Sequence, residues 1–312
     1  MSPSGAEEVL FRSAIAAINS DDHLRVYTQD VYGRVKETSY NGEWEDATIV
    51  DVITSVKIGS PIAAISKKLN NIRVYYISAK NNLREAAYDA NRGWYDGGIN
   101  YEVAPYSKVA ATFLPAGDKL VPRVYAQLLD NTIQEWGHNG DGAWKFFKSL
   151  GRALPGTELA STSFMWSQLS IRVYLQSPKV DLIEKCYDAN TNSNWSNGQF
   201  MVENALPRTA ITATSLGASS DSFRLRVFYA AHNLRLIEKI FEGKVWEDGD
   251  FNKPTTPGTI PGTQAAVINW GGNPSDHNMR VYFQKGELVT GVTEWAWWDS
   301  SWKPGRLAIP PA

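Results

Sequence analysis

The sequence predicts an all-β fold, a six-bladed β-propeller with four antiparallel strands in each blade. The first reason is a repeat with a mean period of 51 residues, which is the length of a four-stranded blade. The second is that the segments inside each repeat are short, rich in Val, Ile, Tyr and Thr, and separated by turn residues, as strands are. The third is that apolar residues do not recur at the spacings of three and four that a helical solenoid needs.

The repeat is marked by the tripeptide Arg-Val-aromatic, which occurs at intervals of 48, 50, 49, 54 and 54 residues. Its arginines are Arg25, Arg73, Arg123, Arg172, Arg226 and Arg280. Six units of this length fill nearly all of the 312 residues, so we expect one domain, 1–312, rather than two. The predicted repeats are approximately 9–58, 59–105, 106–155, 156–207, 208–261 and 262–312.

Within each repeat the first predicted strand is a short apolar run, at 15–18, 62–65, 109–112, 211–214 and 265–268, with a looser version at 158–164. Alanines recur in these runs, and small side chains suit the crowded strand nearest the central axis of a propeller. The strand with the arginine follows. Next comes a segment with a glutamate at its third place, and then a tryptophan in a setting rich in Gly, Asn and Asp.

The glutamate stands 12 residues after the arginine in the first five repeats and 14 residues after it in the sixth. These glutamates are Glu37, Glu85, Glu135, Glu184, Glu238 and Glu294. An even spacing across a hairpin places both side chains on one side of the sheet. With the turn centred on Val31, we expect Arg25 and Glu37 to lie directly opposite each other.

A cross-strand salt bridge is the structural alternative, and a single exposed pair of this kind contributes only about 0.2–1 kcal/mol. Recurrence in all six repeats favours a ligand-binding role. The faces of a blade pack on its neighbours, and an ion pair without a ligand in that cleft would bear a desolvation cost. A guanidinium donates hydrogen bonds, a carboxylate accepts them, and an indole offers an apolar face. This combination fits a neutral, hydroxyl-rich molecule with an apolar side, such as a monosaccharide.

One tryptophan in each repeat is predicted to line a pocket with the arginine and the glutamate, with packing between blades as the alternative. These tryptophans are Trp44, Trp94, Trp144, Trp195, Trp246 and Trp302. A second residue, three positions after each glutamate, is a candidate for the pocket wall. This set is Tyr40, Tyr88, His138, Tyr187, Phe241 and Trp297. Its odd offset predicts the opposite face of the strand, so either a bulge brings it to the pocket or it packs between blades.

Composition excludes several other classes of protein. The net charge of −2 lacks the basic surface of a nucleic-acid binder, and the single Cys186 excludes an internal disulfide and a four-thiolate zinc site. No apolar run approaches the length of a membrane span, and the start of the chain lacks a signal-peptide pattern. We therefore expect a soluble protein without cofactor, metal or membrane insertion. Its expected location is the cytoplasm, or outside the cell or on its surface after release by a non-classical route. A homodimer is left open.

The six Arg-Val-aromatic tripeptides, the six matched glutamates and the tryptophan-bearing turns resemble those of the fungal fucose-specific lectins, of the Aleuria aurantia lectin type. The resemblance covers essentially the whole chain. It implies a six-bladed propeller that binds fucose in the grooves between blades, with Arg and Glu hydrogen-bonding the sugar and the Trp of the same repeat completing each site. It also implies that the partners are fucosylated glycans and glycoproteins on cell surfaces, which a multivalent lectin would agglutinate.

Two other functions remain as alternatives, a propeller glycosidase and a protein-interaction scaffold. A glycosidase needs a pair of carboxyl groups in one unique site, whereas each repeat here offers one recurring glutamate. We also expect the facing arginine to depress the carboxyl pKa, which is unsuitable for a general acid. The sites should differ in affinity, and the third is expected to be the weakest because of His138 and Pro122.

Overall fold

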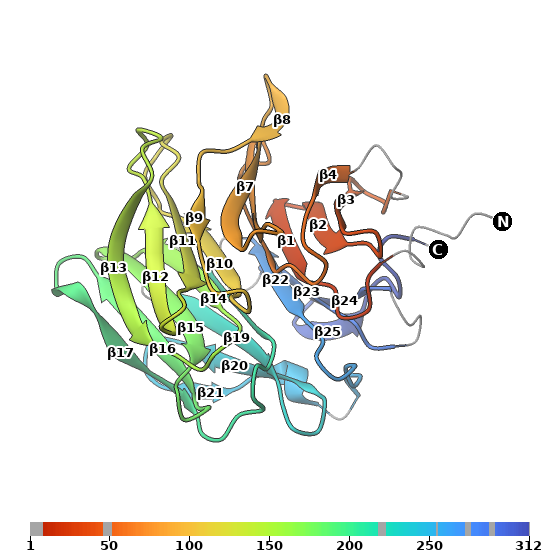
Figure 1. The fold of residues 1–312 in the computed structure, drawn as a ribbon. Coiled ribbons are helices and arrows are strands. Elements are labelled where there is room, and N and C mark those ends of the chain that lie inside the picture. The colour runs from red at the N-terminus through yellow and green to blue at the C-terminus, as the bar shows by residue number, and fades with distance from the viewer. Residues whose placement is uncertain are drawn as a thin grey trace.

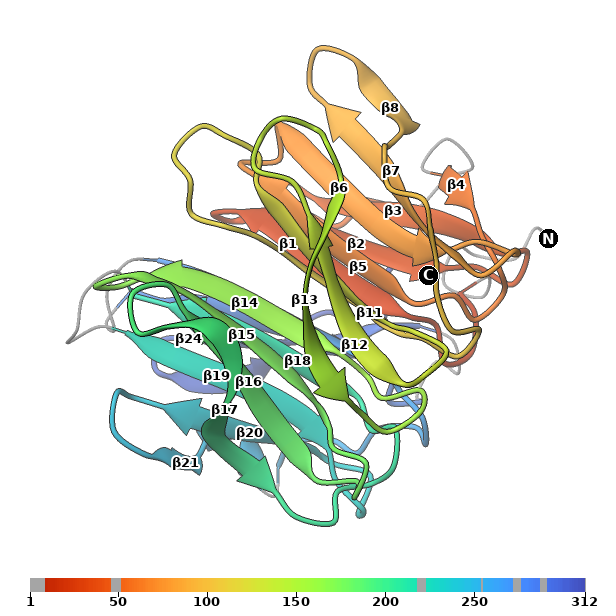
Figure 2. The same cartoon turned by 60° about the vertical axis from the view of Figure 1, so that its left-hand side comes forward.

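The computed structural model describes residues 9–45, 52–217, 223–253, 255–271, 276–286 and 291–311. The predicted fold is confirmed: six antiparallel sheets, each with consecutive strands as neighbours, form the blades of a propeller (Figure 1). Each sheet contains four strands, and the second carries the short additional strand β9 beside β7. Figure 2 shows β5–β7 and β14–β17 as parts of two separate sheets. No helix in the described residues is long and apolar enough to cross a membrane.

The strands of each blade lie within one of the six predicted repeats. Blade 1 contains β1 (Ile15–Ser20), β2 (His23–Gln29), β3 (Arg34–Tyr40) and β4 (Val52–Ser55). Blade 2 contains β5 (Ile62–Lys67), β6 (Asn71–Ile77), β7 (Asn82–Asp89), β8 (Gly93–Asp96) and β9 (Tyr101–Glu102). Blade 3 contains β10 (Val109–Phe113), β11 (Pro122–Gln127), β12 (Thr132–Gly137) and β13 (Lys145–Arg152).

The second half of the ring repeats this order. Blade 4 contains β14 (Ala160–Met165), β15 (Leu169–Gln176), β16 (Leu182–Asp188) and β17 (Asn192–Val202). Blade 5 contains β18 (Ile211–Leu216), β19 (Arg224–Ala230), β20 (Leu236–Phe241) and β21 (Trp246–Asp248), followed by the 3₁₀ turn η3 (Asp250–Asn252). Blade 6 contains β22 (Ala265–Trp270), β23 (Asn278–Phe283), β24 (Thr293–Trp298) and β25 (Ser301–Pro304).

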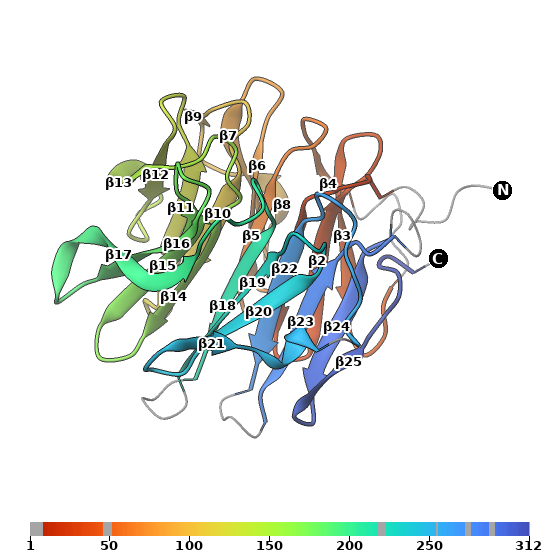
Figure 3. The ribbon, with the colours of Figure 1, turned by 90° about the horizontal axis from the view of Figure 1, so that it is seen from below.

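The first strands of all six blades surround a central cavity of about 240 Å³. Alanines such as Ala17, Ala64 and Ala111 line it, as expected for the strands that crowd around the axis. The first and last blades are neighbours, because β22 lies against β1, and Figure 3 shows strands of both blades on the same side of the molecule.

The apolar core lies between the blades. In each of six buried clusters, the aromatic residue of one Arg-Val-aromatic tripeptide packs with the valine of the next. Tyr27 of blade 1, for example, packs with Val74 of blade 2, and Tyr282 of blade 6 packs with Val26 of blade 1. The tripeptide thus sends its aromatic ring towards the following blade and its valine towards the preceding one, because consecutive strand residues point to opposite faces.

Buried glutamines join four of the blades to the segment that leads into the following blade. They stand at the end of the second strand, four residues after the arginine, at Gln29, Gln127, Gln176 and Gln284. Gln284 closes the ring: its amide oxygen accepts a hydrogen bond from the Arg12 N–H at 2.8 Å, and its Nε2 donates to the Leu10 carbonyl at 3.2 Å. Blade 6 is therefore tied by polar contacts to the chain segment that precedes blade 1.

We expect Gln284→Ala to lower the free energy of unfolding by about 1–3 kcal/mol, because it leaves a backbone donor and acceptor without their partner. Urea unfolding would measure the change. Gln264→Ala is the matched control, since the Gln264 side chain makes no hydrogen bond to any residue that the structure describes, and it should change stability by less than about 0.5 kcal/mol. Equal effects of the two substitutions would show that Gln284 does not hold the ring closed.

Candidate functional site

The second and third strands of each blade carry the arginine and the glutamate on one side of the sheet. Their register differs from the expectation by one step: Arg25 is directly opposite Ser39, and Glu37 is directly opposite Tyr27. The reason is the turn, in which the Asp30 N–H bonds to the Arg34 carbonyl, so the hairpin is centred on Tyr32 instead of Val31. Arginine and glutamate are therefore diagonal neighbours, a separation that long side chains can bridge.

All six predicted pairs form ion pairs in the structure. The nearest nitrogen–oxygen distances are 3.4 Å for Arg25–Glu37, 3.7 Å for Arg73–Glu85, 3.3 Å for Arg123–Glu135, 3.8 Å for Arg172–Glu184, 3.1 Å for Arg226–Glu238 and 3.6 Å for Arg280–Glu294. In five of them the closest nitrogen is Nε, and only in Arg226 is it Nη1.

Each of those five arginines also donates from Nη1 to the carbonyl of the residue before it. In blades 1–4 the guanidinium makes a further bond to an Asn or Asp that stands 16 residues later. These residues are Asn41, Asp89, Asn139 and Asp188, at 2.8–3.1 Å. The sequence analysis missed this set, although an amide or carboxylate at a fixed spacing was visible in four repeats. The guanidinium is thus held from two sides before any ligand is present.

In blades 1, 3 and 4 the glutamate is oriented by the tyrosine directly opposite it. The hydroxyls of Tyr27, Tyr125 and Tyr174 donate to the facing carboxylate at 2.6, 3.4 and 2.9 Å. In blade 2 the Gly98 N–H also donates to Glu85 at 3.2 Å.

A glycine lies against the carboxylate from the outer strand. It stands third after the tryptophan, at Gly97, Gly198, Gly249 and Gly305. A Cβ at these positions would come within 1.8–2.4 Å of the glutamate side chain. This Trp-x-x-Gly spacing was the second signal that the sequence analysis missed.

The tryptophans lie beside the ion pair of the preceding blade, so their assignment to the same repeat was wrong. Each indole packs edge-on against the aromatic residue opposite the preceding glutamate, with centroid distances of 5.8–6.5 Å and interplanar angles of 80–90°. Trp195 donates from Nε1 to Glu135 at 3.2 Å, and Trp302 donates to Glu238 at 3.1 Å. The tryptophan lies on the outer part of its own blade and packs against the preceding blade. The sequence of a single repeat could not indicate this contact between blades.

The second predicted set accompanies these tryptophans. Each of its six members packs against the tryptophan of its own blade at 5.1–5.9 Å between ring centroids. The odd offset places these side chains on the opposite face of the strand, as expected, and that face borders the preceding cleft. No bulge is required, because the residue belongs to a different pocket from the glutamate three positions before it.

The site is therefore a cleft between neighbouring blades, which we number by the blade that provides the ion pair. Cleft I contains Arg25, Glu37, Trp94 and Tyr88; cleft II, Arg73, Glu85, Trp144 and His138; cleft III, Arg123, Glu135, Trp195 and Tyr187; cleft IV, Arg172, Glu184, Trp246 and Phe241; cleft V, Arg226, Glu238, Trp302 and Trp297; and cleft VI, Arg280, Glu294, Trp44 and Tyr40. The two features expected to weaken the third site are thereby separated, with Pro122 before the arginine of cleft III and His138 in the wall of cleft II.

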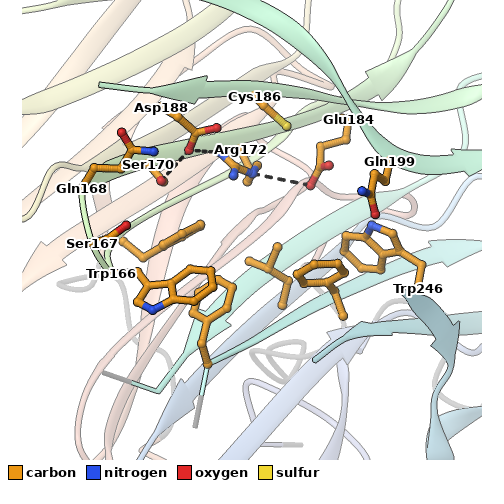
Figure 4. Close-up of a pocket in the computed structure, with 15 residues that line it drawn as sticks. Trp166, Ser167, Gln168, Ser170, Arg172, Glu184, Cys186, Asp188, Gln199 and Trp246 are labelled. Atoms are coloured by element: carbon orange, nitrogen blue, oxygen red, sulfur yellow. Dashed lines mark hydrogen bonds and ion pairs between the residues drawn. The ribbon is translucent and has the colours of Figure 1, made fainter. Parts of the chain in front are cut away.

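Cavities are present at clefts III and IV. Cleft III has a volume of about 150 Å³, lined by Arg123, Glu135, Trp195 and Tyr187 among others. Cleft IV has a volume of about 290 Å³, and Figure 4 shows Arg172 and Glu184 along one side with Trp246 at the Glu184 end. Both cavities combine charged groups of one blade with aromatic residues of the next.

Cleft V is the most closed. Glu238 is fully buried and is bonded by Arg226 at 3.1 Å, by the Phe251 N–H at 2.9 Å and by Trp302. Its facing aromatic residue is Phe228, which has no hydroxyl to donate. More of the hydrogen-bonding capacity of the Glu238 carboxylate is therefore used by protein groups than in the glutamates of the other clefts.

Burial dominates the electrostatics of these carboxylates. It raises the pKa of Glu85, Glu135, Glu238 and Glu294 above the ordinary value, although the facing arginine acts in the opposite direction. Our expectation of a depressed pKa was therefore wrong for these four residues, because desolvation outweighs the ion pair. Burial also raises the pKa of Cys186, which lines cleft IV, to about 12, so its thiol is not a nucleophile at neutral pH.

The clefts offer fixed donors, a desolvated acceptor and an apolar wall, which is the chemistry of hydroxyl recognition. Across the described parts of the chain, no group of three or more His, Cys, Asp and Glu side chains is placed to hold a metal ion.

We expect Gly198→Ala to lower the free energy of unfolding by about 1–3 kcal/mol, the usual range for overpacking a buried site. The new methyl group would lie 1.9 Å from a Glu184 oxygen and must displace this carboxylate. Thermal or urea unfolding would measure the loss. Gly258→Ala is the control, because its Cβ would meet only the Leu234 carbonyl at an ordinary 3.5 Å. A Gly198 variant as stable as this control would contradict the close packing.

Comparison with known proteins identifies the family. The family model of the fungal fucose-specific lectins matches residues 9–312. The fucose-specific lectins of Aspergillus fumigatus and Aspergillus oryzae are 42% and 40% identical over the whole of both chains, and that of Aleuria aurantia is 30% identical over 93% of each.

Solved structures agree with the sequence relatives. SapL1 lectin in complex with alpha methyl fucoside has a TM-score of 0.90 and 40% identity, over 99% of this chain and 100% of that one. The six-bladed propeller of Aleuria aurantia lectin has a TM-score of 0.83 and 27% identity, over 98% and 97% of the two chains. With its repeats, fold and clefts in agreement with these proteins, the chain belongs to the fungal fucose-specific lectin family.

Proposed function

We propose that this chain is a multivalent lectin that holds the fucose of fucosylated glycans in the clefts between its blades. The observation that carries the proposal is the recurrence, in all six clefts, of an Arg–Glu ion pair facing a tryptophan of the next blade. Its relatives are named fucose-specific lectins, and SapL1 lectin was solved with alpha methyl fucoside. Family membership favours a carbohydrate-binding protein without enzymatic activity over a glycosidase or an interaction scaffold.

We propose a role for each group of the cleft. The carboxylate accepts hydrogen bonds from sugar hydroxyls, the guanidinium donates to the hydroxyl and ring oxygens, and the aromatic wall covers the apolar side with the methyl group. Because both charged groups are held by other contacts, little side-chain freedom is lost on binding. Water competes for the same bonds, so we expect a dissociation constant of about 1 µM to 1 mM for a single cleft.

Several clefts on one rigid ring can bind several fucose residues of a cell-surface glycoprotein. Such multivalent binding strengthens attachment by roughly 10²–10⁴ without new contacts, provided that the glycans can reach two clefts at once. A homodimer would double the number of clefts in one particle. We propose that the protein acts outside the cell that makes it, where the fucosylated glycans are.

We propose that cleft V contributes least to binding, because Glu238 is fully buried and already bonded within the protein.

Calorimetry with methyl fucoside tests both the function and the assignment of tryptophans to clefts. Arg172→Ala with Trp246→Ala should remove one binding site, because both residues belong to cleft IV. Arg172→Ala with Trp195→Ala should remove two sites, because Trp195 belongs to cleft III. If each tryptophan instead acted with the arginine of its own repeat, the two double variants would give the opposite result.

The control for that experiment is Trp302→Ala, which removes a tryptophan of the same kind from the closed cleft V and should leave the number of sites almost unchanged. Far-UV circular dichroism establishes that each variant is folded. An unmodified chain that releases no heat with methyl fucoside at millimolar concentration would refute the proposed function.

Fucose binding should weaken as the pH falls, starting above the ordinary carboxyl pKa of 4.5, since burial raises the pKa of the glutamates in clefts II, III, V and VI. Protonation of the glutamate removes the charged hydrogen-bond acceptor.

The stability of the fold changes with pH in the opposite direction, because a raised pKa means that the folded state favours the protonated glutamate. The stability that these groups contribute is full below pH 4.5 and is lost as the pH rises through the folded-state pKa.

Calorimetric titrations between pH 7 and pH 4, with thermal unfolding alongside, would separate the two effects. Glu85→Gln should remove the pH dependence of cleft II, since an amide does not titrate in this range. Affinity that stays constant down to pH 4 would contradict the prediction.

A further inference from the structure

Cleft IV is about twice as large as cleft III, with 290 Å³ against 150 Å³. The smaller cavity already contains the whole set of arginine, glutamate, tryptophan and second aromatic residue. The additional volume of cleft IV therefore lies beyond the groups that we assign to fucose. It extends along blade 4 to the turn between β14 and β15, where Trp166, Ser167 and Gln168 line it.

Trp166 lies at the end of the cleft opposite Trp246, with Arg172 and Glu184 between them (Figure 4). Its indole stacks on the ring of Phe223, with 5.6 Å between centroids and 17° between planes, and Phe223 in turn contacts Phe164 at 4.4 Å. Phe164 and Phe223 are buried, whereas Trp166 is 48% exposed. Trp166 is thus a supported aromatic platform with a surface open to solvent.

Polar groups surround this platform. Ser167 is exposed, and Gln168 is partly so; the Gln168 side chain is positioned by bonds to the Asn190 N–H at 2.6 Å and the Thr191 hydroxyl at 2.9 Å. The two carboxylates that line the cavity, Asp188 and Glu184, are both paired with Arg172, at 3.0 and 3.8 Å. The extension therefore combines a flat apolar surface with uncharged donors and acceptors.

A tryptophan between the first and second strands is found in this repeat alone. The corresponding segments of the other repeats are residues 21–22, 68–70, 114–121, 217–223 and 271–277, and their sequences contain no tryptophan or tyrosine. The extension is a property of cleft IV and not of the repeat.

We propose that cleft IV has a second subsite, in which Trp166, Ser167 and Gln168 receive the sugar residue to which the fucose is linked. The proposal rests on the proposed function, since it requires fucose beside Arg172 and Glu184. A neutral pyranose suits the subsite because one face of the ring is apolar and stacks on an indole, while its hydroxyls bond to hydroxyl and amide groups. Continuity of the cavity with the ion pair allows one disaccharide to occupy both parts.

The test uses a chain with only cleft IV intact, made by Arg→Ala substitution at Arg25, Arg73, Arg123, Arg226 and Arg280. Calorimetry compares methyl fucoside, fucosyl-α1,6-N-acetylglucosamine, fucosyl-α1,2-galactose and phenyl fucoside. At least one disaccharide should bind roughly tenfold more tightly than methyl fucoside, as expected for one additional aromatic contact. Trp166→Ala should abolish this gain and leave the affinity for methyl fucoside unchanged within about twofold.

The matched control keeps Arg123 in place of Arg172, so that only cleft III remains, and should show no gain with either disaccharide. Equal affinity of cleft IV for methyl fucoside and both disaccharides would overturn the proposal. A gain with phenyl fucoside alone would also overturn it, since the extension would then accept apolar groups and not sugars. If cleft IV binds none of the four compounds, the subsite is overturned, whereas the proposed function fails only if the unmodified chain also binds none of them.

A second measurement covers the case in which the fivefold variant does not fold. Crystals of the unmodified chain soaked with the disaccharides should show the second sugar ordered against Trp166 in cleft IV. Fucose bound at Arg172 with its linked sugar directed into solvent, away from Trp166, would overturn the subsite while leaving the proposed function intact.

Discussion

The structure depends on the Arg–Glu ion pair of the clefts, which is largely buried but can still be reached by a ligand. A buried guanidinium and carboxylate lose hydration, and their mutual attraction restores only part of that loss. Here part of the remainder is offset by fixed local partners, such as the Ile72 carbonyl and Asp89 for Arg73, the Gly98 N–H for Glu85 and the Tyr174 hydroxyl for Glu184. Such a pair keeps hydrogen-bonding capacity directed into the cleft, where hydroxyl groups can use it without any rearrangement of the protein.

Neither wall of a cleft is sufficient alone, because one blade provides the charges and the next provides the aromatic rings. Binding is thus coupled to the packing of blades, which rests on the aromatic–valine contacts of successive tripeptides. At cleft VI the coupling joins the two ends of the sequence, because Trp44 packs on Tyr282 of the blade that carries Arg280 and Glu294. That cleft exists only when the ring is closed, a condition to which the Gln284 bonds contribute directly.

Individual side chains then differentiate the clefts within one repeated scheme. Phe228 in place of tyrosine accompanies a glutamate that is fully buried and bonded within the protein, whereas Trp166 extends the cavity of cleft IV. One propeller can in this way combine clefts that differ in their exposure to solvent and in how far their cavities extend from the ion pair. For a multivalent protein such variety broadens the range of glycans that at least some clefts accept, while the ion pair retains the shared specificity.

The amino-acid sequence by itself determined the number of blades, the order of strands and the presence of Arg25 and Glu37 on one face, because these follow from repetition and from hairpin alternation within about 50 residues. Only the tertiary structure decided which tryptophan lies beside which ion pair, since Trp94 packs on Tyr27, opposite Glu37, through the packing of separate blades. It also decided the one-step register of the hairpin, through the turn after Asp30. The direction of the glutamate pKa shifts was likewise unavailable from the sequence, because it depends on how deeply neighbouring blades bury each carboxylate.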